Sequence, residues 1–219
     1  MNGRKVERGY HVISILEAIY RQTMQSELEE LADAVNDLDL QKVTIQLNSP
    51  GGSTSVGFDI VNYMQRLHDR NAILETNIIN YAASMAAEIF VRGDVRIMGR
   101  NDIILFHQAM LEIDGWDVSS AEMRELVDTG HLRRSQVSGF VSFLNTQAGQ
   151  TWLRRNIQDM RDEVDGFEAE ERADTEWLAE RLGKPYDWVV QHVVVPFENR
   201  SINGVTALEY GIATQLDRS

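Results

Sequence analysis

Hydrophobic and polar residues alternate in several short stretches of the N-terminal half of the chain. In residues 42–47 (KVTIQL), the side chains of Val43, Ile45 and Leu47 fall on one side, which is typical of a strand with one buried face. Similar stretches predict further strands at residues 10–16, 72–79, 95–98 and 103–107. The N-terminal half therefore predicts a β-sheet.

Segments whose apolar residues recur with a helical period separate most of these strands. The apolar positions of a first predicted helix are Met24, Leu28, Leu31, Ala32 and Val35, and those of a second are Val56, Ile60, Tyr63, Met64 and Leu67. Ser26 and Glu29 have the spacing of a capping box at the start of the first helix. A third, short helix is predicted from Ser84 to Phe90. Strands and helices in this alternation predict an α/β fold of repeated βαβ units with a largely parallel sheet.

The C-terminal half has a different pattern. Residues 119–182 contain no proline and are rich in helix formers, so two or more long helices are predicted. Residues 158–182 carry ten acidic side chains against three arginines, which favours a solvated helix face over a binding surface. Residues 193–197 (VVVPF) are strand-like, and residues 206–217 predict a short helix, a capping Gly211 and a final strand. We expect the four tryptophans, Trp116, Trp152, Trp177 and Trp188, to pack the helices of this half or an interface.

Composition excludes several classes of function. The net charge of -13 disfavours non-specific binding to nucleic acid or to anionic membranes. The absence of cysteine excludes disulfides, thiolate zinc sites and a cysteine nucleophile. No signal-peptide pattern opens the chain and no apolar run is long enough to span a bilayer, so a cytoplasmic protein is expected. We predict neither a metal site nor a cofactor, because the spacing of His11, His68, His131 and His192 is not that of metal ligands.

A nucleophile and a base follow two of the predicted strands. Ser84 lies in the small-residue run YAASMAA, and His107 ends the strand at residues 103–107. A serine needs a base to remove its proton, and the attacked carbonyl oxygen needs backbone N–H donors. The SPGG turn offers glycine amides for this purpose, and Met85 follows the serine.

Each of these features, taken alone, is more often structural. A serine among alanines commonly fills a buried helix, SPGG is an ordinary turn, and a histidine at a strand end commonly belongs to the core. Their order on consecutive βα units makes the catalytic interpretation stronger, because parallel strands end at the same edge of a sheet. Asp59, Glu88 and Asp102 are expected to be solvent-facing or helix-terminal charges.

Three segments resemble the proteolytic subunit of the Clp protease (ClpP) and its phage relatives: NSPGGSTSVGFDIVNYM, YAASMAA and ILFHQ. The likeness returns near the C-terminus at ENRSINGVTALEYGIATQLD. The resemblance implies a crotonase-like α/β spiral with a projecting helical handle. It implies Ser84 as nucleophile, His107 as base, and an oxyanion hole formed by the amides of Gly52 and Met85.

The chain departs from the family pattern at two places. The stretch between His107 and ALEYG is longer than usual, which predicts a single domain over residues 1–219 whose handle is enlarged at about 119–182. The position of the third triad member, normally an aspartate, corresponds to Asn199. An asparagine carbonyl can accept a hydrogen bond from the imidazole but adds no charge, and the Asp-to-Asn change can cost about four orders of magnitude in rate. Glu198 is the alternative source of a carboxylate, and an unassisted Ser-His dyad is another.

The function predicted is that of a serine endopeptidase which cleaves peptide bonds inside a self-compartmentalised homo-oligomeric ring. The resemblance implies unfolded polypeptides or peptides as substrates and an ATP-driven unfoldase as a partner, because the chain has no P-loop of its own. Three alternatives remain open: a phage capsid-maturation protease, a catalytically silent ring subunit, and a crotonase-type acyl-CoA enzyme. The Ser-His pair and the lack of a basic phosphate-binding cluster disfavour the last.

Overall fold

A computed structural model of the chain describes residues 9–107, 110–113, 115–132, 138–194 and 200–217. Contacts along the backbone divide the chain into two compact units. The first unit consists of residues 1–106 and 201–219, and the second of residues 107–200. The predicted insertion at 119–182 falls within the second unit, while a single domain over 1–219 stays a prediction.

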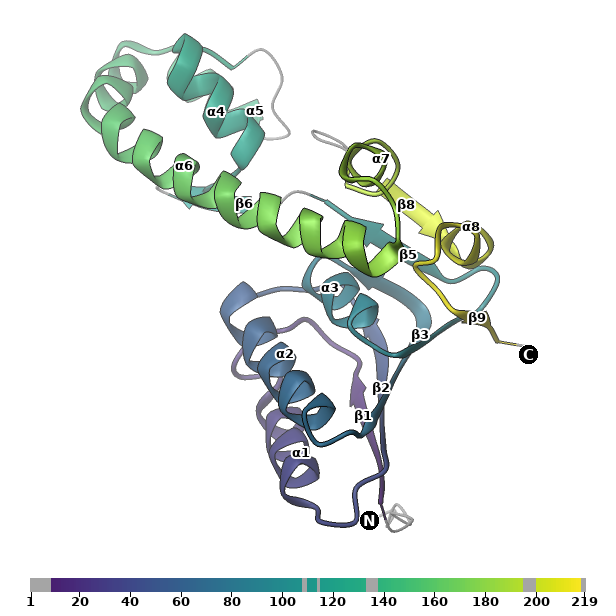
Figure 1. The fold of residues 1–219 in the computed structure, drawn as a ribbon. Helices are drawn as coiled ribbons and strands as arrows, with labels where there is room; N and C mark the ends of the chain where they lie inside the picture. Colours follow the sequence, from purple (N-terminus) through teal and green to yellow (C-terminus); the bar gives the residue numbers. More distant parts are fainter. Residues whose placement is uncertain (1–8, 108–109, 114, 133–137, 195–199, 218–219) are drawn as a thin grey trace. The chain divides into compact units, whose positions relative to one another are not determined.

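The first unit is built on a parallel sheet covered by helices (Figure 1). The strands are β1 (Tyr10–Ile15), β2 (Lys42–Ser49), β3 (Ile73–Ala83), β4 (Val95–Met98), β5 (Ile103–Phe106), β8 (Arg200–Asn203) and β9 (Gln215–Leu216). Among the described residues the sheet order is β1-β2-β3-β4-β9, with parallel pairing throughout, while β5 pairs with β3 and with β8. The helices are α1 (Gln25–Asn36), α2 (Thr54–His68), α3 (Met85–Val91) and α8 (Gly204–Tyr210). The predicted βαβ units are therefore confirmed.

Alternation along the strands decides which face of the sheet is covered. In β2, Val43, Ile45 and Leu47 are fully buried. The residues that alternate with them, from Lys42 to Gln46, are only partly buried. The helices supply the other half of the core, with Leu31 of α1 among the side chains that have no exposed surface. This burial is the main source of stability for the unit.

The predicted capping box at the start of α1 is wrong. The helix begins at Gln25 with Met24 as its N-cap residue, and no side chain caps it. The hydroxyl of Ser26 instead lies 2.8 Å from a carboxylate oxygen of Glu27. Because the helix starts before Ser26, the Ser26–Glu29 spacing no longer matches the N-cap and N3 positions that a capping box requires.

Arg96 fastens the C-terminal segment to β4. Only 6% of this residue is exposed, and its guanidinium donates hydrogen bonds to the carbonyl oxygens of Gly93 (2.9 Å), Gly211 (2.9 Å) and Ile212 (2.7 Å). A buried guanidinium without acceptors would be costly, so these carbonyls make the turn after α8 part of the core. The predicted helix, left-handed Gly211 (φ 80°) and final strand are all present there.

The second unit begins with an antiparallel hairpin that the sequence pattern did not predict, formed by β6 (Met110–Ile113) and β7 (Trp116–Ser119). Its helices are α4 (Ser120–Thr129), α5 (Ser138–Leu144), α6 (Gln147–Leu182) and α7 (Tyr186–His192). With 36 residues, α6 extends about 54 Å at the usual rise per residue. The expectation of several long helices thus becomes one long helix with shorter partners.

This unit has a hydrophobic core of its own. The buried residues are Val118, Met123, Leu126, Val127, Phe140, Leu144, Leu153, Met160 and Val164. Phe140 is fully buried and its ring lies 5.6 Å from Trp116 and 6.0 Å from Trp152, centroid to centroid. These two tryptophans pack the helices as predicted.

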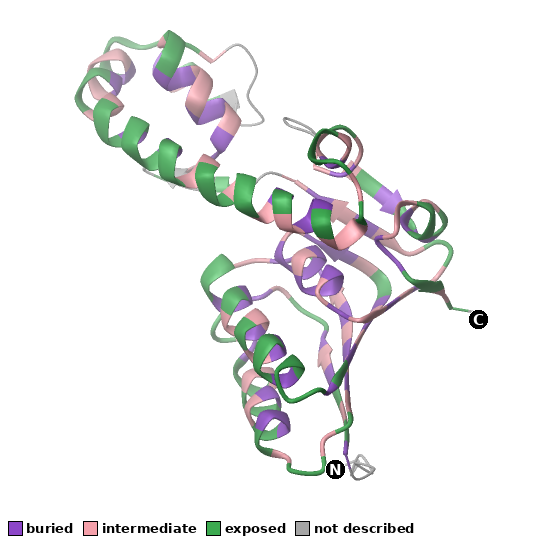
Figure 2. Cartoon of the chain, viewed as in Figure 1, coloured by how far each residue is buried: buried purple, intermediate pink, exposed green. Residues whose placement is uncertain are grey.

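Most acidic residues of α6 are exposed, and Figure 2 shows green along much of this helix. Arg124 of α4 donates to Glu168 at 2.8 Å and also binds Asp165, and these hydrogen bonds raise the pKa of Arg124 above its ordinary value. Ser120 donates to Glu171 of the same helix. The predicted solvated face thus holds for most of these acids, whereas Glu168 and Glu171 are half-buried where they join α6 to α4.

Residues 193–197, predicted to be strand-like, are described only in part. Val193 has helical φ and ψ angles as the C-cap of α7, so no strand begins there. Residues 195–197 lie outside the described residues.

Candidate active site

The strand that leads to Ser84 changes partner before it ends. Residues 75–78 of β3 pair with β4, whereas Tyr81–Ala83 pair with Ile103–Leu105 of β5. Between these two pairings the register against β2 also shifts, since Leu47 faces Ile78 and Ser49 faces Ala82. Four residues of β3 therefore pass two of β2, which makes a bulge at residues 79–81. The bulge redirects the end of β3 towards β5.

Ser84 stands at the turn from β3 into α3 in a backbone conformation that is rare for a residue with a side chain. Its φ is 53° and its ψ is −127°. Such conformations cost free energy and persist only where surrounding contacts hold them, as in the nucleophile elbow of hydrolases. The Ser84 N–H donates to the carbonyl oxygen of Leu105 at 3.0 Å, which holds the turn against β5.

The hydroxyl of Ser84 is not used to cap α3. Ser84 is the N-cap residue, yet its side chain makes no capping hydrogen bond, and the residue is half-buried. An N-cap serine ordinarily accepts a hydrogen bond from an amide in the first turn. The Ser84 hydroxyl therefore does not act as a helix cap.

Small and buried neighbours surround the turn. Ala82, Ala83 and Ala86 are at most 3% exposed, and Met85 is 5% exposed. The Met85 side chain packs onto Gly57 of α2, where an added methyl group would lie 1.9 Å from the Met85 sulfur. The side chain of Met85 is thus directed into the core, and its backbone amide occupies the first turn of α3, where helical amides have no intrahelical acceptor.

The SPGG turn lies directly against Ser84. Gly51 has φ 87°, and a methyl group there would lie 2.5 Å from the Ala83 carbonyl oxygen and 2.7 Å from Ser84 Cβ. Only glycine permits both this φ and this approach. Gly52 has φ 150° and forms an isolated parallel bridge with Ile19.

Hydrogen bonds fix the conformation of this turn. Ile19 donates to the Gly51 carbonyl oxygen and accepts from Ser53, both at 2.8 Å, while the Gly51 amide donates to Ser49 Oγ at 3.1 Å. Among the residues that the structure describes, the amide of Gly52 has no acceptor. The structure therefore brings Gly51 against Ser84 and Met85, while Gly52 packs on Ile19 in the same turn.

His107 follows β5 directly in the chain and is half-buried. It is the first residue of the second unit, whereas Ser84 belongs to the first. Asn199 and its alternative, Glu198, lie outside the described residues. The roles of His107 and Asn199 consequently stay predictions.

A family model provides an independent test of identity. The model of the Clp protease family matches residues 9–138, which is more than half of the chain. The chain belongs to the Clp protease family. The match includes the SPGG turn, the Ser84 motif and His107, and ends before α6 and the C-terminal ALEYG segment.

Membership of the Clp protease family agrees with the mixed α/β architecture and its parallel sheet. It implies peptidase activity of the serine type, and the family generally forms oligomeric rings that act on peptides. No helix within the described part of the chain combines the length and the apolar character needed to cross a membrane. The described residues also contain no cluster of three or more acidic or histidine side chains suited to a metal ion.

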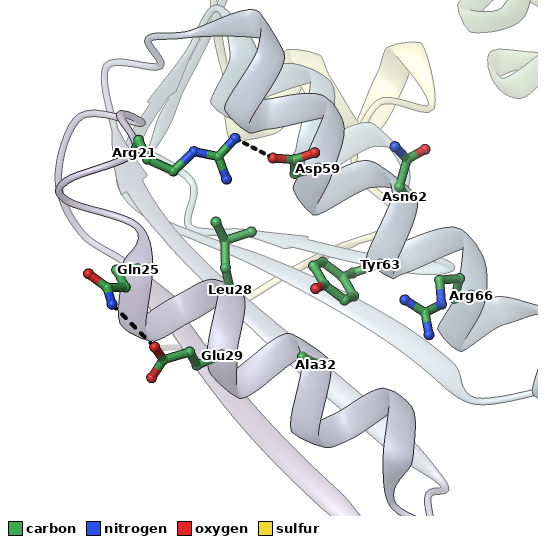
Figure 3. Close-up of a pocket in the computed structure, with 9 residues that line it drawn as sticks. All are labelled: Arg21, Gln25, Leu28, Glu29, Ala32, Asp59, Asn62, Tyr63 and Arg66. Carbon is green, nitrogen blue, oxygen red and sulfur yellow. Dashed lines mark hydrogen bonds and ion pairs between the residues drawn. The ribbon is translucent and has the colours of Figure 1, made fainter.

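A groove of about 630 Å³ lies between α1 and α2 and is shown in Figure 3. Arg21 and Asp59 form an ion pair of 2.6 Å at its edge, and the Arg66 guanidinium lies 5.5 Å from the centre of the Tyr63 ring. Asp59 faces solvent as predicted, with 41% of its side chain exposed, and pairs there with Arg21. Ser84 does not line the groove, so the groove adds no residue to the candidate active site.

The environment of Asp102 differs from the one that the sequence predicted. Asp102 was expected to be a solvent-facing or helix-terminal charge, but it is half-buried and accepts two backbone hydrogen bonds. A signal was available in its position between two predicted strands, where aspartate commonly binds turn amides.

Proposed function

We propose that this Clp family member is a serine endopeptidase that cleaves polypeptides through an acyl-enzyme on Ser84. The observation that carries the proposal is the strained Ser84 turn packed against Gly51. A conformation of this kind has a cost in stability, which is retained where it aims a reacting group. The substrates are unfolded chains or peptides admitted into a homo-oligomeric ring, and an ATP-driven unfoldase supplies the unfolding.

The first half of the reaction forms the acyl-enzyme. Ser84 Oγ attacks the carbonyl carbon of the scissile bond while its proton passes to a ring nitrogen of His107. The carbonyl oxygen becomes an oxyanion that accepts hydrogen bonds from the amides of Gly52 and Met85. The C–N bond then breaks, and the protonated His107 gives its proton to the departing amine.

The second half releases the acyl group. A water molecule gives a proton to His107 and attacks the acyl carbon, and the same two amides bind the second oxyanion. The ester bond breaks and His107 returns the proton to Ser84 Oγ. Asn199 accepts a hydrogen bond from the other ring nitrogen of His107 and selects the productive tautomer without adding a negative charge.

Covalent labelling tests the nucleophile. A fluorophosphonate probe should form a bond between its phosphorus and Ser84 Oγ with loss of fluoride. Ser84→Ala should abolish labelling and lower kcat for an unfolded polypeptide by about 10²-fold, because a triad whose third member is an asparagine has already lost most of the rate of a full triad. The matched control is Ser55→Ala, which removes an exposed hydroxyl bonded to Ser53 and should change neither.

Two outcomes would contradict the proposal. Labelling that persists in Ser84→Ala would assign the nucleophile to another residue. A wild-type protein that binds polypeptide but is neither labelled nor active would favour the catalytically silent ring subunit. A capsid-maturation role shares the chemistry and would be recognised by neighbouring genes for portal and capsid proteins.

The third triad member has its own test. Asn199→Asp introduces a carboxylate at the proposed third triad position and should raise kcat more than tenfold, since the reverse change in a serine triad is costly. Glu198→Gln is the companion variant and should leave kcat unchanged. A large loss of activity in Glu198→Gln would transfer the role to Glu198.

A further inference from the structure

The bulge in β3 is held open by a carboxylate that comes from outside the strand. Asn80, within the bulge, has φ 74°, and its N–H donates to Asp102 Oδ1 at 3.2 Å. The other oxygen, Oδ2, accepts from the N–H of Gly99 at 2.6 Å. Bonds from amides to an ionised carboxylate are stronger than those between neutral groups. Asp102 thus joins the bulge to the turn between β4 and β5.

The packing leaves this carboxylate little freedom. A methyl group on Gly99 would lie 2.9 Å from Asp102 Oδ2, and one on Gly204 would lie 2.1 Å from the Gly99 carbonyl oxygen. The Asp102 N–H also donates back to the Gly99 carbonyl oxygen at 3.1 Å. Close packing at Gly99 and Gly204 therefore fixes the position of the Asp102 carboxylate.

The two segments that Asp102 joins are those that end at the candidate active site. Asn80 precedes Ser84 by four residues, and β5 begins immediately after Asp102. The same β5 accepts the Ser84 amide through Leu105 and leads into His107. A change in the bulge would shift the end of β3 against β5, and displacements of about 1 Å at a reacting group can cost about 10²-fold in rate.

We propose that Asp102 is a positioning residue for Ser84, acting through the amide of Asn80 to hold the bulge that sets the strained turn. This inference rests on the proposed role of Ser84 as the nucleophile. Asp102 itself contacts neither the hydroxyl nor the oxyanion amides in the hydrogen bonds it makes. Its contribution is to geometry, so it affects the rate of attack rather than the binding of substrate.

The experiment compares Asp102→Asn with Asp94→Asn in the full-length protein. Asp94 is a matched control because its Oδ2 accepts from the N–H of Leu74 at 3.0 Å, at the opposite end of the same strand. Each substitution preserves size and replaces one acceptor oxygen with an NH₂ group. Unfolding temperature, kcat, KM and the rate constant for fluorophosphonate labelling are measured for both variants.

The proposal expects similar falls in unfolding temperature for the two variants but different kinetics. Asp102→Asn should lower kcat and the labelling rate constant by a common factor of tenfold or more, with KM unchanged. Asp94→Asn should keep wild-type kinetics. Equal kinetics in the two variants, or a change in KM alone, would overturn the positioning role.

Failure of the proposed function is distinguishable from failure of this inference. If the wild-type protein is not labelled at Ser84, the proposed nucleophile is wrong and the positioning role is overturned with it. If the wild-type protein is labelled and Asp102→Asn is labelled equally fast, only the positioning role is overturned. Hydrogen exchange of the peptide spanning residues 79–86 gives a separate readout, in which Asp102→Asn should exchange faster and Asp94→Asn should not.

Discussion

The two units of this chain use different means to define their structure. Both units bury apolar side chains, but the first also holds non-glycine residues at positive φ, including Asn80 and Ser84. In the described part of the second unit, positive φ values occur only at glycines, and the core around Phe140 is accompanied by regular helix caps such as the Ser119–Glu122 capping box. The difference indicates that strain is concentrated where the proposed chemistry occurs, and that the helical unit is built for stability.

The largest expected effect comes from emptying the core of the second unit. Phe140→Ala should lower the free energy of unfolding of this unit by about 4 kcal/mol, because a fully buried ring is lost and a cavity remains. Site-resolved hydrogen exchange should show the loss in α4 and α6. Leu38→Ala, at a side chain that is 92% exposed, is the control and should change stability by less than about 0.5 kcal/mol. Equal effects in the two variants would mean that Phe140 does not organise this core.

The next effect compares two glycines. One is needed because another segment packs closely against it, and the other is needed only because its φ is positive. Gly51→Ala should lower kcat about 10²-fold, since the new methyl group collides with Ala83 and Ser84 and displaces the oxyanion amides. Gly115→Ala has a similar φ of 83° but meets no atom within 4 Å, so it should lower stability by about 1–2 kcal/mol through its φ alone and leave kcat unaffected. Peptidase assays with a fluorogenic peptide make the comparison. A loss of kcat in Gly115→Ala of the same size would remove the special role of the SPGG turn.

A smaller effect concerns the strain at Ser84 itself. Ser84→Gly should be more stable than Ser84→Ala by about 1–2 kcal/mol, because glycine adopts φ 53° without the penalty that a Cβ atom brings. Both variants lack the hydroxyl and should be inactive. Denaturant unfolding monitored within the first unit measures the difference. If Ser84→Gly were the less stable variant, the turn would not be strained.

The smallest effect is a dependence of stability on pH in the first unit. The hydrogen bond from His11, at 3.0 Å, lowers the pKa of Asp37 below its ordinary value of 3.8. A lowered pKa stabilises the folded state above pH 3.8, and this contribution disappears as the pH falls through the lower folded value. The stability difference between wild type and Asp37→Asn should therefore narrow on acidification below pH 3.8. A difference that stays constant from pH 6 to pH 2 would argue against this pair.

The sequence predicted most of the first unit because its strands and helices have clear periods. It predicted the start of α1 wrongly, since the same S-x-x-E spacing occurs at Ser26 and at Ser119 but caps a helix only at the second. Where a helix begins depends on the preceding chain, which the spacing does not encode. The β6–β7 hairpin was missed because each of its strands has only four residues, too few for a clear period.

The residues of the candidate site that belong to short sequence motifs could be predicted from the sequence. The SPGG and AASM segments identified Gly51, Gly52, Ser84 and Met85, and the structure places Gly51 of the first segment against Ser84 and Met85 of the second. The bulge and its carboxylate were not predictable, because they depend on register shifts between strands distant in sequence. The two hydrogen bonds on which the proposed role of Asp102 rests, from Asn80 and Gly99, can be seen only in the folded structure.

The division of the first unit into two chain segments has a consequence for biosynthesis. The ribosome completes residues 107–200 before it makes the final segment, so the helical unit can begin to fold while the sheet still lacks β9. Until Gly211 and Ile212 emerge, Arg96 has two fewer carbonyl acceptors for its guanidinium. Completion of the sheet beside β4 is thus a late event, whereas the strands that hold the Ser84 turn, β2, β3 and β5, are all synthesised before the helical unit.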